Sequence, residues 1–514
     1  SGKTRALTYR IAYLIQEKGV SPYNILAITF TNKAAQQMKE RVNSLIGRVS
    51  QNMWICTFHS ACAQILRREI QHLGFSPNFA IYDEDDTRRL IKMCLKDLDL
   101  DPKRYPPGMI QAAIDRAKNE LIDSETFASK AESYPEKIVA EVYKLYQQRL
   151  YDNNALDFGD LIMTTVDIFR LFPEVLEKYQ NRFQYVLIDE YQDTNRAQYV
   201  LVNLLAAKHR NLCVVGDPDQ SIYQWRSADI RNILEFENDY PDARVITMEQ
   251  SYRSTQSILE AANYVIQNNM IRKPKTLWTA NVKGEAITAY QAENEHDEAI
   301  YVVAEIERLM TKDEGRRTKD FTIFYRTHAQ SRVFEEVFIR SGLPYKIVGG
   351  LKFYERLEVK DILAYLRVIS NPRDTVSLKR IINRPKRGIG EATVAEIDKY
   401  VTSHESRVTS FFEALNRLSN APLPSPSPLK SPQFPPLEKG GEGGFGGGAR
   451  ARKNIKAFVD ILNGFIALKD KLTIEELATR VLKNTGYLAE LEAEGTIEAQ
   501  GRIENLQEFV AVIQ

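Results

Sequence analysis

The chain opens with four residues whose types and order are suited to binding phosphate. Ser1-Gly2-Lys3-Thr4 precedes a helical pattern and matches the end of the motif G-x-x-x-x-G-K-[ST]. In that motif, backbone amides at a helix N-terminus surround the phosphates, the lysine reaches the β- and γ-phosphates, and the threonine hydroxyl holds Mg²⁺. Four residues alone are weak evidence, because a chance helix start could supply them.

A second group suited to phosphate chemistry stands at the end of an apolar segment. Residues 185–188 are followed directly by the carboxylates of Asp189 and Glu190. An aspartate in this place can support Mg²⁺, and the glutamate beside it can position or deprotonate an attacking water. A solvated Asp-Glu pair is common at strand ends, but the continuation Tyr-Gln-Asp-Thr-Asn argues against that interpretation.

The two groups suited to phosphate chemistry must be held in place by secondary structure, and the pattern of the chain indicates the strand ends of a parallel sheet. In the first half of the chain, short apolar runs alternate with helical patterns, which is typical of a parallel sheet covered on both faces. The predicted strands are Ile25–Phe30, Trp54–Phe58, Tyr185–Asp189, Leu212–Gly216 and Val245–Met248, with others near Ala286–Tyr290, Thr322–Tyr325 and Tyr345–Val348. From Phe75 to Asn154, and again from about Leu351 onward, the pattern predicts helices only.

Composition sets the broad class. A chain of 514 residues is too long for one hydrophobic core, so about two to four domains are expected. The net charge is only +1, but a protein that moves along nucleic acid needs a basic track rather than a basic whole. No apolar run is long enough to span a membrane. The four cysteines lack C-x-x-C spacing, which favours buried thiols in a reducing cytosol over a zinc or redox site.

Several segments, in order, resemble the motifs of UvrD/Rep/PcrA-type superfamily 1 DNA helicases. The segments are Thr29–Ala35, Thr57–Ser60, Leu156–Phe158, Asp189–Asp193, Val215–Arg226, Gln250–Ser254, Tyr325–Thr327 and Gly349–Tyr354. Their order and spacing leave little room for chance. The resemblance implies an α/β fold with two RecA-like P-loop motor domains, each with a parallel sheet and a mainly helical accessory insertion. It also implies a cytoplasmic, ATP-dependent helicase that translocates 3′-to-5′ on single-stranded DNA and unwinds duplex DNA in repair or replication.

The resemblance also implies a division into domains. Residues 1–74 and 155–247 would form the first motor domain, and residues 75–154 its helical insertion. Residues 248–350 would begin the second motor domain, and residues 351–514 its helical insertion. Within that insertion, residues 421–448 are so rich in proline and glycine that we predict disorder. The start of the P-loop and the later family motifs are absent, so we expect a chain truncated at both ends with impaired ATP hydrolysis.

For ATP hydrolysis, the resemblance assigns three catalytic residues. Glu190 would act on the attacking water, Gln220 would sense the γ-phosphate, and Arg253 would be an arginine finger that neutralises transition-state charge. The residues implied to bind ATP are Ser1, Gly2, Lys3, Thr4, Arg5 and Tyr252, the last by stacking on adenine. Thr4 and Asp189 would hold Mg²⁺.

For DNA, the resemblance implies a track of rings and polar groups at the motif ends, comprising Phe30, Asn32, Thr57, His59, Phe158, Tyr223, Trp225 and Arg226. Bases stack on such rings at about 1–3 kcal/mol each, without sequence preference. Core packing is a serious alternative for Phe30 and for Phe58, whereas stacking is favoured for Trp225. The amides of Gly388 and Gly390 could meet a duplex phosphate, although a tight turn between helices explains these glycines nearly as well.

The expected partners are single-stranded DNA and duplex junctions, together with repair or replication proteins of unknown identity, and no membrane. Two alternatives stay open at this point. The chain could be the helicase subunit of a RecB/AddA-like helicase-nuclease, although its compact insertions favour the first interpretation. It could also be an inactive DNA-binding remnant of a broken gene, although Lys3, Asp189, Glu190 and Arg253 are intact. Gly159 departs from the family pattern, since many relatives carry aspartate there.

Overall fold

The computed structural model describes residues 2–47, 53–313, 315–348, 353–402, 410–420 and 449–513. Three subjects of the sequence analysis lie outside these ranges: Ser1, residues 349–352 of the Gly349–Tyr354 motif, and the proline- and glycine-rich segment 421–448. The described residues form a mixed α/β fold in which helices predominate and the paired strands are parallel. The predicted fold class is confirmed.

Four parallel strands form the main sheet, in the order β2-β1-β5-β6. Their bounds are β1 Ile25–Thr29, β2 Trp54–Thr57, β5 Tyr185–Ile188 and β6 Leu212–Val214. In the register, Leu26 of β1 lies opposite Trp54 on one side and Val186 on the other. All of β1 is buried, and its alternate residues join different core clusters, because successive side chains point to opposite faces of a sheet.

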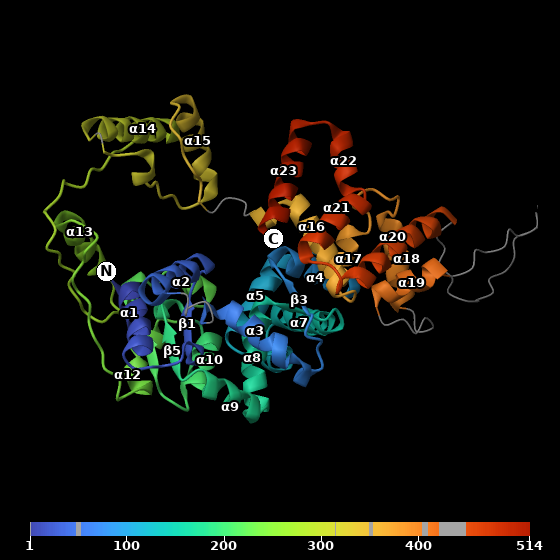
Figure 1. The fold of residues 1–514 in the computed structure, drawn as a ribbon, viewed down its shortest axis with the longest axis horizontal. Helices are drawn as coiled ribbons and strands as arrows, with labels where there is room; N and C mark the ends of the chain where they lie inside the picture. Colours follow the sequence, from blue (N-terminus) through green and yellow to red (C-terminus); the bar gives the residue numbers. More distant parts are fainter. Residues whose placement is uncertain are drawn as a thin grey trace, which may run out of the picture.

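Helices cover both faces of this sheet (Figure 1). One face packs against α1 (Lys3–Gln16) and α2 (Asn32–Ile46). The other packs against α3 (Phe58–Glu69), α8 (Phe158–Leu171), α9 (Pro173–Arg182) and α10 (Arg196–Ala206). Short 3-10 helices, η1 (Pro22–Asn24) and η4 (Tyr191–Asp193), lie at the ends of strands.

Between α3 and α8 the chain leaves the sheet and builds what we call the first helical unit. It contains η3 (Ile70–Leu73), α4 (Glu84–Asp97), α5 (Pro107–Asn119), α6 (Ser124–Lys130) and α7 (Tyr134–Asp152). Its strand β3 (Ala80–Tyr82) pairs with β4 (Ala155–Asp157), so the prediction of helices only is wrong at this point. Three residues are too short for a periodic signal. Capping boxes at Asp83 and Ser133 explain where α4 and α7 begin.

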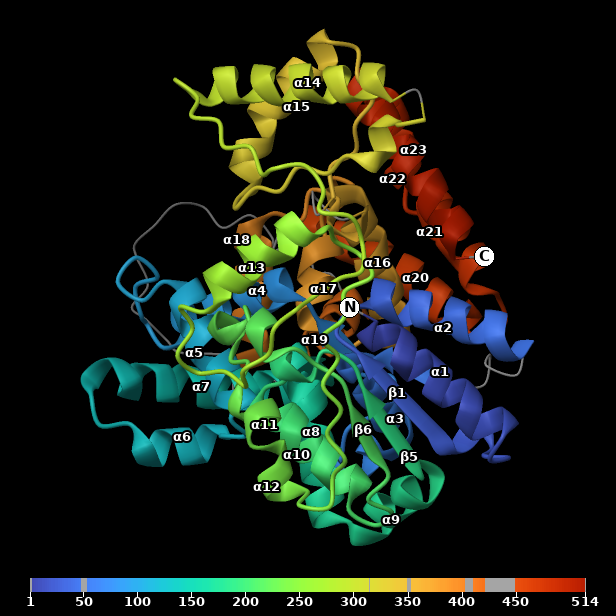
Figure 2. The same ribbon diagram turned by 90° about the vertical axis from the view of Figure 1, so that its left-hand side faces the viewer.

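The middle of the chain contains helices joined by extended segments. The helices are α11 (Arg231–Leu234), α12 (Phe236–Asp239), α13 (Gln256–Ile266), α14 (Glu295–Lys312), α15 (Ser331–Arg340), η5 (Pro218–Gln220), η6 (Gln224–Arg226), η7 (Thr318–Asp320) and η8 (His328–Gln330). Helices α14 and α15 share a small apolar core and lie at the top of both ribbon views, away from the main sheet (Figures 1 and 2).

Four predicted strands are absent from this described part of the chain, namely Val245–Met248, Ala286–Tyr290, Thr322–Tyr325 and Tyr345–Val348. Their apolar side chains are largely exposed, with Ile246 at 71% and Phe324 at 91%. A strand forms only when a neighbour meets its backbone groups, and the pairing here is one isolated bridge between Gln250 and Trp278. The β-branched and aromatic residues of these segments have a high strand propensity, but no neighbouring strand among the described residues pairs with them.

The last part of the described chain forms the second helical unit, around one apolar core. Its elements are η9 (Phe353–Glu355), α16 (Leu357–Ser370), α17 (Thr375–Ile381), α18 (Glu391–Thr402), α19 (Phe411–Asn420), α20 (Ala449–Leu468), α21 (Ile474–Asn484), α22 (Tyr487–Glu494) and α23 (Ile497–Val512). Among the helices described here and above, none combines the length and apolar character needed to cross a membrane.

The two helical units contact each other, with α17 packed beside α4 (Figure 1). The Tyr82 hydroxyl donates to Asp374 Oδ1 at 2.7 Å, across 292 residues of sequence. Arg367 Nη1 lies 2.6 Å from Asp86 Oδ2. The side-chain amide of Asn371 donates to two backbone carbonyls at the end of α7. Buried polar groups thus hold together parts of the chain that are distant in sequence.

Candidate functional site

The first turn of α1 lies against the end of β5. Lys3 Nζ is 3.1 Å from Glu190 Oε2, and the Thr4 hydroxyl donates to Asp189 Oδ2 at 3.0 Å. Gly2, which precedes the helix, has φ of +97°, a conformation that favours glycine. The two groups that the sequence marked for phosphate chemistry, about 185 residues apart, therefore meet at one edge of the sheet.

The electrostatics of this corner are suited to a cation. Burial raises the pKa of Asp189, the adjacent charge of Glu190 raises it further, and the Thr4 hydrogen bond and Lys3 only partly offset this. Bound positive charge would relieve that cost. A threonine hydroxyl and an aspartate oxygen are ligands that Mg²⁺ accepts, and Mg²⁺ usually takes only one or two carboxylates and fills its shell with water and phosphate oxygens. Thr4 and Asp189 fit that requirement.

A buried glutamine links this corner to the next loop. Gln192 is 1% exposed; its Nε2 donates to Glu190 Oε2 at 2.9 Å, and its Oε1 accepts from the Asp217 amide at 2.9 Å. Gln220 Nε2 in turn donates to Asp217 Oδ2 at 2.5 Å. A continuous polar network therefore runs from Lys3 to Gln220. Neither Gln192 nor Asp217 was predicted to have a role, although both lie in the segments Asp189–Asp193 and Val215–Arg226 that resemble family motifs.

Gly216 makes this network possible by its lack of a side chain. A Cβ at that position would stand 2.7 Å from Gln192 Oε1 and 2.5 Å from Ile233 Cδ1. Both distances are shorter than carbon can approach without displacement of its neighbours. The close approach of the Gly216 backbone is therefore what lets Gln192 reach the Asp217 amide.

The other residues assigned to ATP lie at the surface. Tyr252 is 68% exposed, and its hydroxyl donates to Gln250 Oε1 at 2.9 Å. Arg253 is exposed as well, and in the described ranges no hydrogen bond or ion pair joins its side chain to Lys3 or Glu190. Arg5 lies over the Tyr9 ring, at 5.3 Å from its centroid. The structure thus brings Lys3 and Glu190 together but leaves Arg253 apart from them.

Three aromatic rings form a row beside the network. Phe30 stacks on Tyr223 with centroids 5.1 Å apart and an interplanar angle of 27°, and Tyr223 lies 6.3 Å from Trp225. The Arg226 guanidinium is 4.6 Å from the Trp225 centroid. Trp225 is 68% exposed. An open row of rings beside a cation is suited to stacking bases and to contacting a phosphate backbone.

The remaining track residues divide between surface and structural positions. His59 meets Phe158 edge-on at 5.6 Å, and Phe158 is 47% exposed. Burial lowers the pKa of His59, so this ring is neutral near pH 7 and offers hydrogen bonds rather than charge. Thr57 is buried and caps α3 by accepting from the Ser60 amide, whereas Asn32 is exposed at the start of α2.

The core alternative is correct for Phe58, which is 4% exposed and lies in the core beneath the sheet. Phe30 is half-buried and packs on Tyr223 instead.

Gly388 and Gly390 are exposed in the turn before α18, and Gly388 has φ of +69°. The Val394 amide donates to the Gly390 carbonyl, so Gly390 is the N-cap residue that precedes the helix. Figure 1 shows α18 on the right, with α5 and α7 of the first helical unit between it and the strands β1 and β5. The structure therefore does not bring these glycines to the aromatic row.

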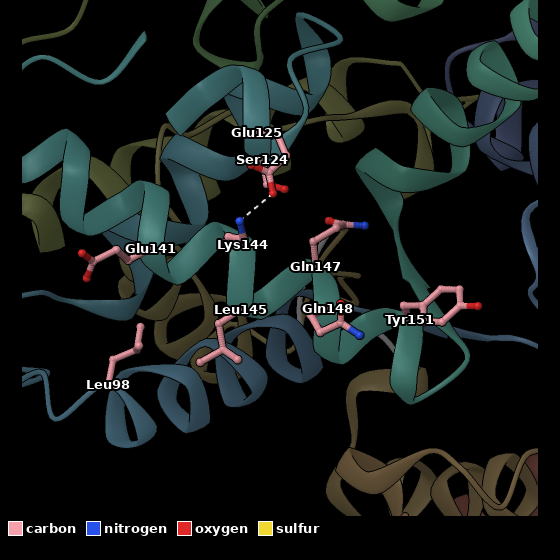
Figure 3. Close-up of a pocket in the computed structure, with 9 residues that line it drawn as sticks. All are labelled: Leu98, Ser124, Glu125, Glu141, Lys144, Leu145, Gln147, Gln148 and Tyr151. Carbon is pink, nitrogen blue, oxygen red and sulfur yellow. Dashed lines mark ion pairs between the residues drawn. The ribbon is translucent and has the colours of Figure 1, made fainter. Parts of the chain in front are cut away.

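A hollow of about 600 Å³ lies on the first helical unit, away from all of these residues (Figure 3). The ion pair between Lys144 and Glu125, at 2.8 Å, lies among its lining residues. The lining consists of Leu98, Ser124, Glu125, Glu141, Lys144, Leu145, Gln147, Gln148 and Tyr151. None of the predicted site residues lines this hollow, and we assign it no function.

Comparison with known proteins gives a consistent result along the chain. Residues 1–241 match the model of the UvrD/REP helicase N-terminal domain, and residues 246–514 match that of the UvrD-like helicase C-terminal domain. The chain is 49% identical over 512 residues to the ATP-dependent DNA helicase PcrA of Staphylococcus aureus (strain Mu50) and of Bacillus subtilis (strain 168), and 50% identical to that of Staphylococcus epidermidis. Each match covers 100% of this chain and 66% of the relative, so the chain spans just under two thirds of the relatives' length.

Proposed function

Since this chain belongs to the UvrD-like helicase family, we propose that it acts as an ATP-dependent DNA helicase. It hydrolyses ATP to translocate 3′-to-5′ on single-stranded DNA, and it unwinds duplex DNA in repair or replication. The observation that carries the proposal is the polar network from Lys3 to Gln220, which ends in the loop that holds Tyr223 and Trp225. One connected structure thereby joins a phosphate site to a row of rings.

In this function the residues of the network have separate roles. The amides at the start of α1 and the Lys3 ammonium bind the phosphates, so Lys3 must leave Glu190 when ATP enters. Glu190, freed from that pair and oriented by Gln192, accepts the proton of the attacking water. Thr4 and Asp189 would hold Mg²⁺, which when bound neutralises charge on the β- and γ-phosphate oxygens. Arg253 reaches the γ-phosphate only after its segment moves towards α1.

On the DNA side, the row formed by Phe30, Tyr223 and Trp225 stacks bases, and Arg226 contacts the backbone. Stacking is tolerant of sequence, so we expect binding without base preference that weakens as salt rises. The partners are single-stranded DNA and duplex junctions, with repair or replication proteins that act on the same DNA. The protein works in the cytoplasm, where such DNA is found.

The test is to measure ATP hydrolysis with and without single-stranded DNA on a protein whose P-loop and later family motifs are complete, because we expect impaired hydrolysis without them. Strand displacement is then measured on duplexes with a 3′ tail and with a 5′ tail. We expect hydrolysis to rise severalfold with DNA, and displacement only from the 3′ tail. The Lys3→Ala variant should bind DNA as the parent does and hydrolyse no ATP. A rate of ATP hydrolysis that does not change when DNA is added would contradict a helicase function. Strand displacement from the duplex with a 5′ tail would contradict the 3′-to-5′ polarity.

A further inference from the structure

A short basic segment connects the Gln220 loop to the backbone that precedes Arg253. Residues 272–279 follow α13, and we call them the strap. At one end, Arg272 Nη2 lies 3.1 Å from Asp219 Oδ2, and Lys275 Nζ lies 3.1 Å from the same oxygen. Lys275 also pairs with Asp217, the residue that accepts the Gln220 hydrogen bond. The strap thus contacts the loop on both sides of Pro218.

These ion pairs are sheltered from water. The four side chains are 10–14% exposed, so salt screens them less than it screens surface pairs. Burial raises the pKa of Asp217, but the hydrogen bond and charge of Lys275 outweigh this, and the net pKa lies below the ordinary range. Arg272 also donates to the carbonyls of Ile266 and Lys275, which folds the strap onto the end of α13.

At its other end the strap pairs with the segment that carries Arg253. The Trp278 amide donates to the Glu249 carbonyl at 3.1 Å, and the Ser251 amide donates to the Trp278 carbonyl at 2.7 Å. The Thr279 hydroxyl donates to the Ser251 carbonyl at 2.7 Å. Arg253 stands two residues beyond Ser251. The strap therefore connects the loop that carries Gln220 to the backbone segment that carries Arg253.

The ion pair between Arg272 and Asp219 is incomplete. Arg272 Nε and Asp219 Oδ1 are both buried, and in the described part of the chain neither has a hydrogen-bond partner. Arginine and carboxylate groups readily form two parallel hydrogen bonds, and here one of the two is formed. The pair thus leaves one buried donor and one buried acceptor that a bond between them would satisfy.

We propose that Arg272 and Lys275 are positioning residues that clamp the loop carrying Gln220 and Trp225 to the segment carrying Arg253. The clamp fixes where Gln220 stands relative to Arg253, and it transmits a displacement of either one to the other. The inference rests on the proposed function, because it concerns the coupling of ATP hydrolysis to the DNA-binding loop.

The catalytic test is a double-mutant cycle of Arg272→Gln, Asp219→Asn and both together. Each single variant should lower DNA-stimulated kcat about tenfold with little change in the KM for ATP, and the double variant should lose no more than the worse single one, since both residues act as a unit. Arg272→Lys should recover part of the loss, because it restores the charge without the second bond. The matched control is Lys273→Gln, whose exposed pair with Glu237 leads us to expect no effect.

A role confined to stability would lower the melting temperature of these variants and leave kcat unchanged, which would overturn the proposal. Additive losses in the double variant, or an equal loss in Lys273→Gln, would overturn it as well.

A distance measurement separates failure of the clamp from failure of the proposed function. Spin labels are placed at Ile222→Cys and Tyr264→Cys, which are 68% and 77% exposed, in a Cys213→Ser background. The clamp predicts one narrow distance distribution, which broadens with Arg272→Gln and stays narrow with Lys273→Gln. If the distribution broadens with Arg272→Gln as predicted, but the protein hydrolyses no ATP, the proposed clamp is supported and the proposed helicase function is contradicted. A broad distribution without any substitution would overturn the clamp.

Discussion

At the scale of single residues, Glu190 has the clearest expected effect. It stands between Lys3 and Gln192, and Glu190→Gln keeps its size while removing its ability to accept a proton. Loss of a general base costs about 10²–10⁴ in rate. We therefore expect DNA-stimulated ATP hydrolysis to fall at least a hundredfold while nucleotide binding persists. Steady-state hydrolysis and titration with a fluorescent nucleotide measure the two quantities. If Glu190→Gln hydrolysed ATP as fast as the parent protein, Glu190 would not be the general base.

Trp225 is the residue whose loss should affect DNA and leave the phosphate corner intact. Its ring is exposed at the end of the row, with Arg226 over it. Loss of one stacking ring costs about 1–3 kcal/mol, so Trp225→Ala should weaken single-strand binding about tenfold and lower the distance moved per ATP. Tyr134→Ala is the matched control, since Tyr134 is 63% exposed and lies in the first helical unit, outside the row and the strap. Unchanged affinity for Trp225→Ala in an anisotropy titration would mean that its ring is not a platform.

Asp115 gives the protein a stability that depends on pH. Burial raises the pKa of Asp115 to about 7, and the charge of Asp157 adds to the shift. The unfolded chain releases this proton near pH 4, so between about pH 4 and pH 7 the carboxyl makes folding less favourable as pH rises. Asp115→Asn should therefore be neutral near pH 4 and stabilising by about 1–3 kcal/mol at pH 8. Thermal unfolding at both pH values, with the exposed Glu141→Gln as control, tests this sign.

At the scale of elements, the turn after β6 depends on Gly216. A methyl group there would collide with Ile233 and Gln192, and overpacking of this kind costs about 1–3 kcal/mol. Gly216→Ala should lower the melting temperature and also lower kcat, because Gln192 is pushed away from Glu190. Gly464→Ala in α20 is the control, since nothing lies within 4 Å of the added carbon and alanine favours a helix. Equal melting temperatures for the two variants would contradict this account of the turn.

The elements that could be predicted were those with a strong local signal and a partner close in the fold. β1, β2, β5 and β6 are continuous apolar runs, and their observed bounds end one or two residues before the predicted ones. The strands predicted around Val245 and Phe324 failed, because propensity does not supply a neighbouring strand.

In the site, the contact between Thr4 and Asp189 could be expected, because the resemblance assigns both residues to the same Mg²⁺. The contacts of Gln192, and of the strap with Asp219, could not be predicted. They depend on where two loops meet, and no periodic pattern along the chain encodes that meeting.

At the scale of the whole molecule, the contact between the helical units includes a partly buried charge pair that can be tested. Arg367→Met leaves the Asp86 carboxylate, 8% exposed, without its ion-pair partner; because the Arg367 side chain is 31% exposed, we expect a cost below the about 3–5 kcal/mol of a fully buried pair. We expect a lower melting temperature, which the double variant with Asp86→Asn partly restores because the uncompensated charge is gone. Denaturant unfolding of the four proteins of this cycle measures the coupling. If the losses of stability in the two single variants simply added in the double variant, the interaction between Arg367 and Asp86 would contribute nothing to stability.

The hydrogen bond between Tyr82 and Asp374 can form only after both residues have been synthesised, which fixes a minimum delay for the newly made chain. A ribosome adds about 5–20 residues per second, so the 292 residues that separate these partners take about 15–60 s to synthesise. The first helical unit emerges early and must wait that long before α17 covers its polar groups and Val376 completes its core. Slow translation, or a pause between these points, prolongs the time in which this surface is open to proteases and chaperones.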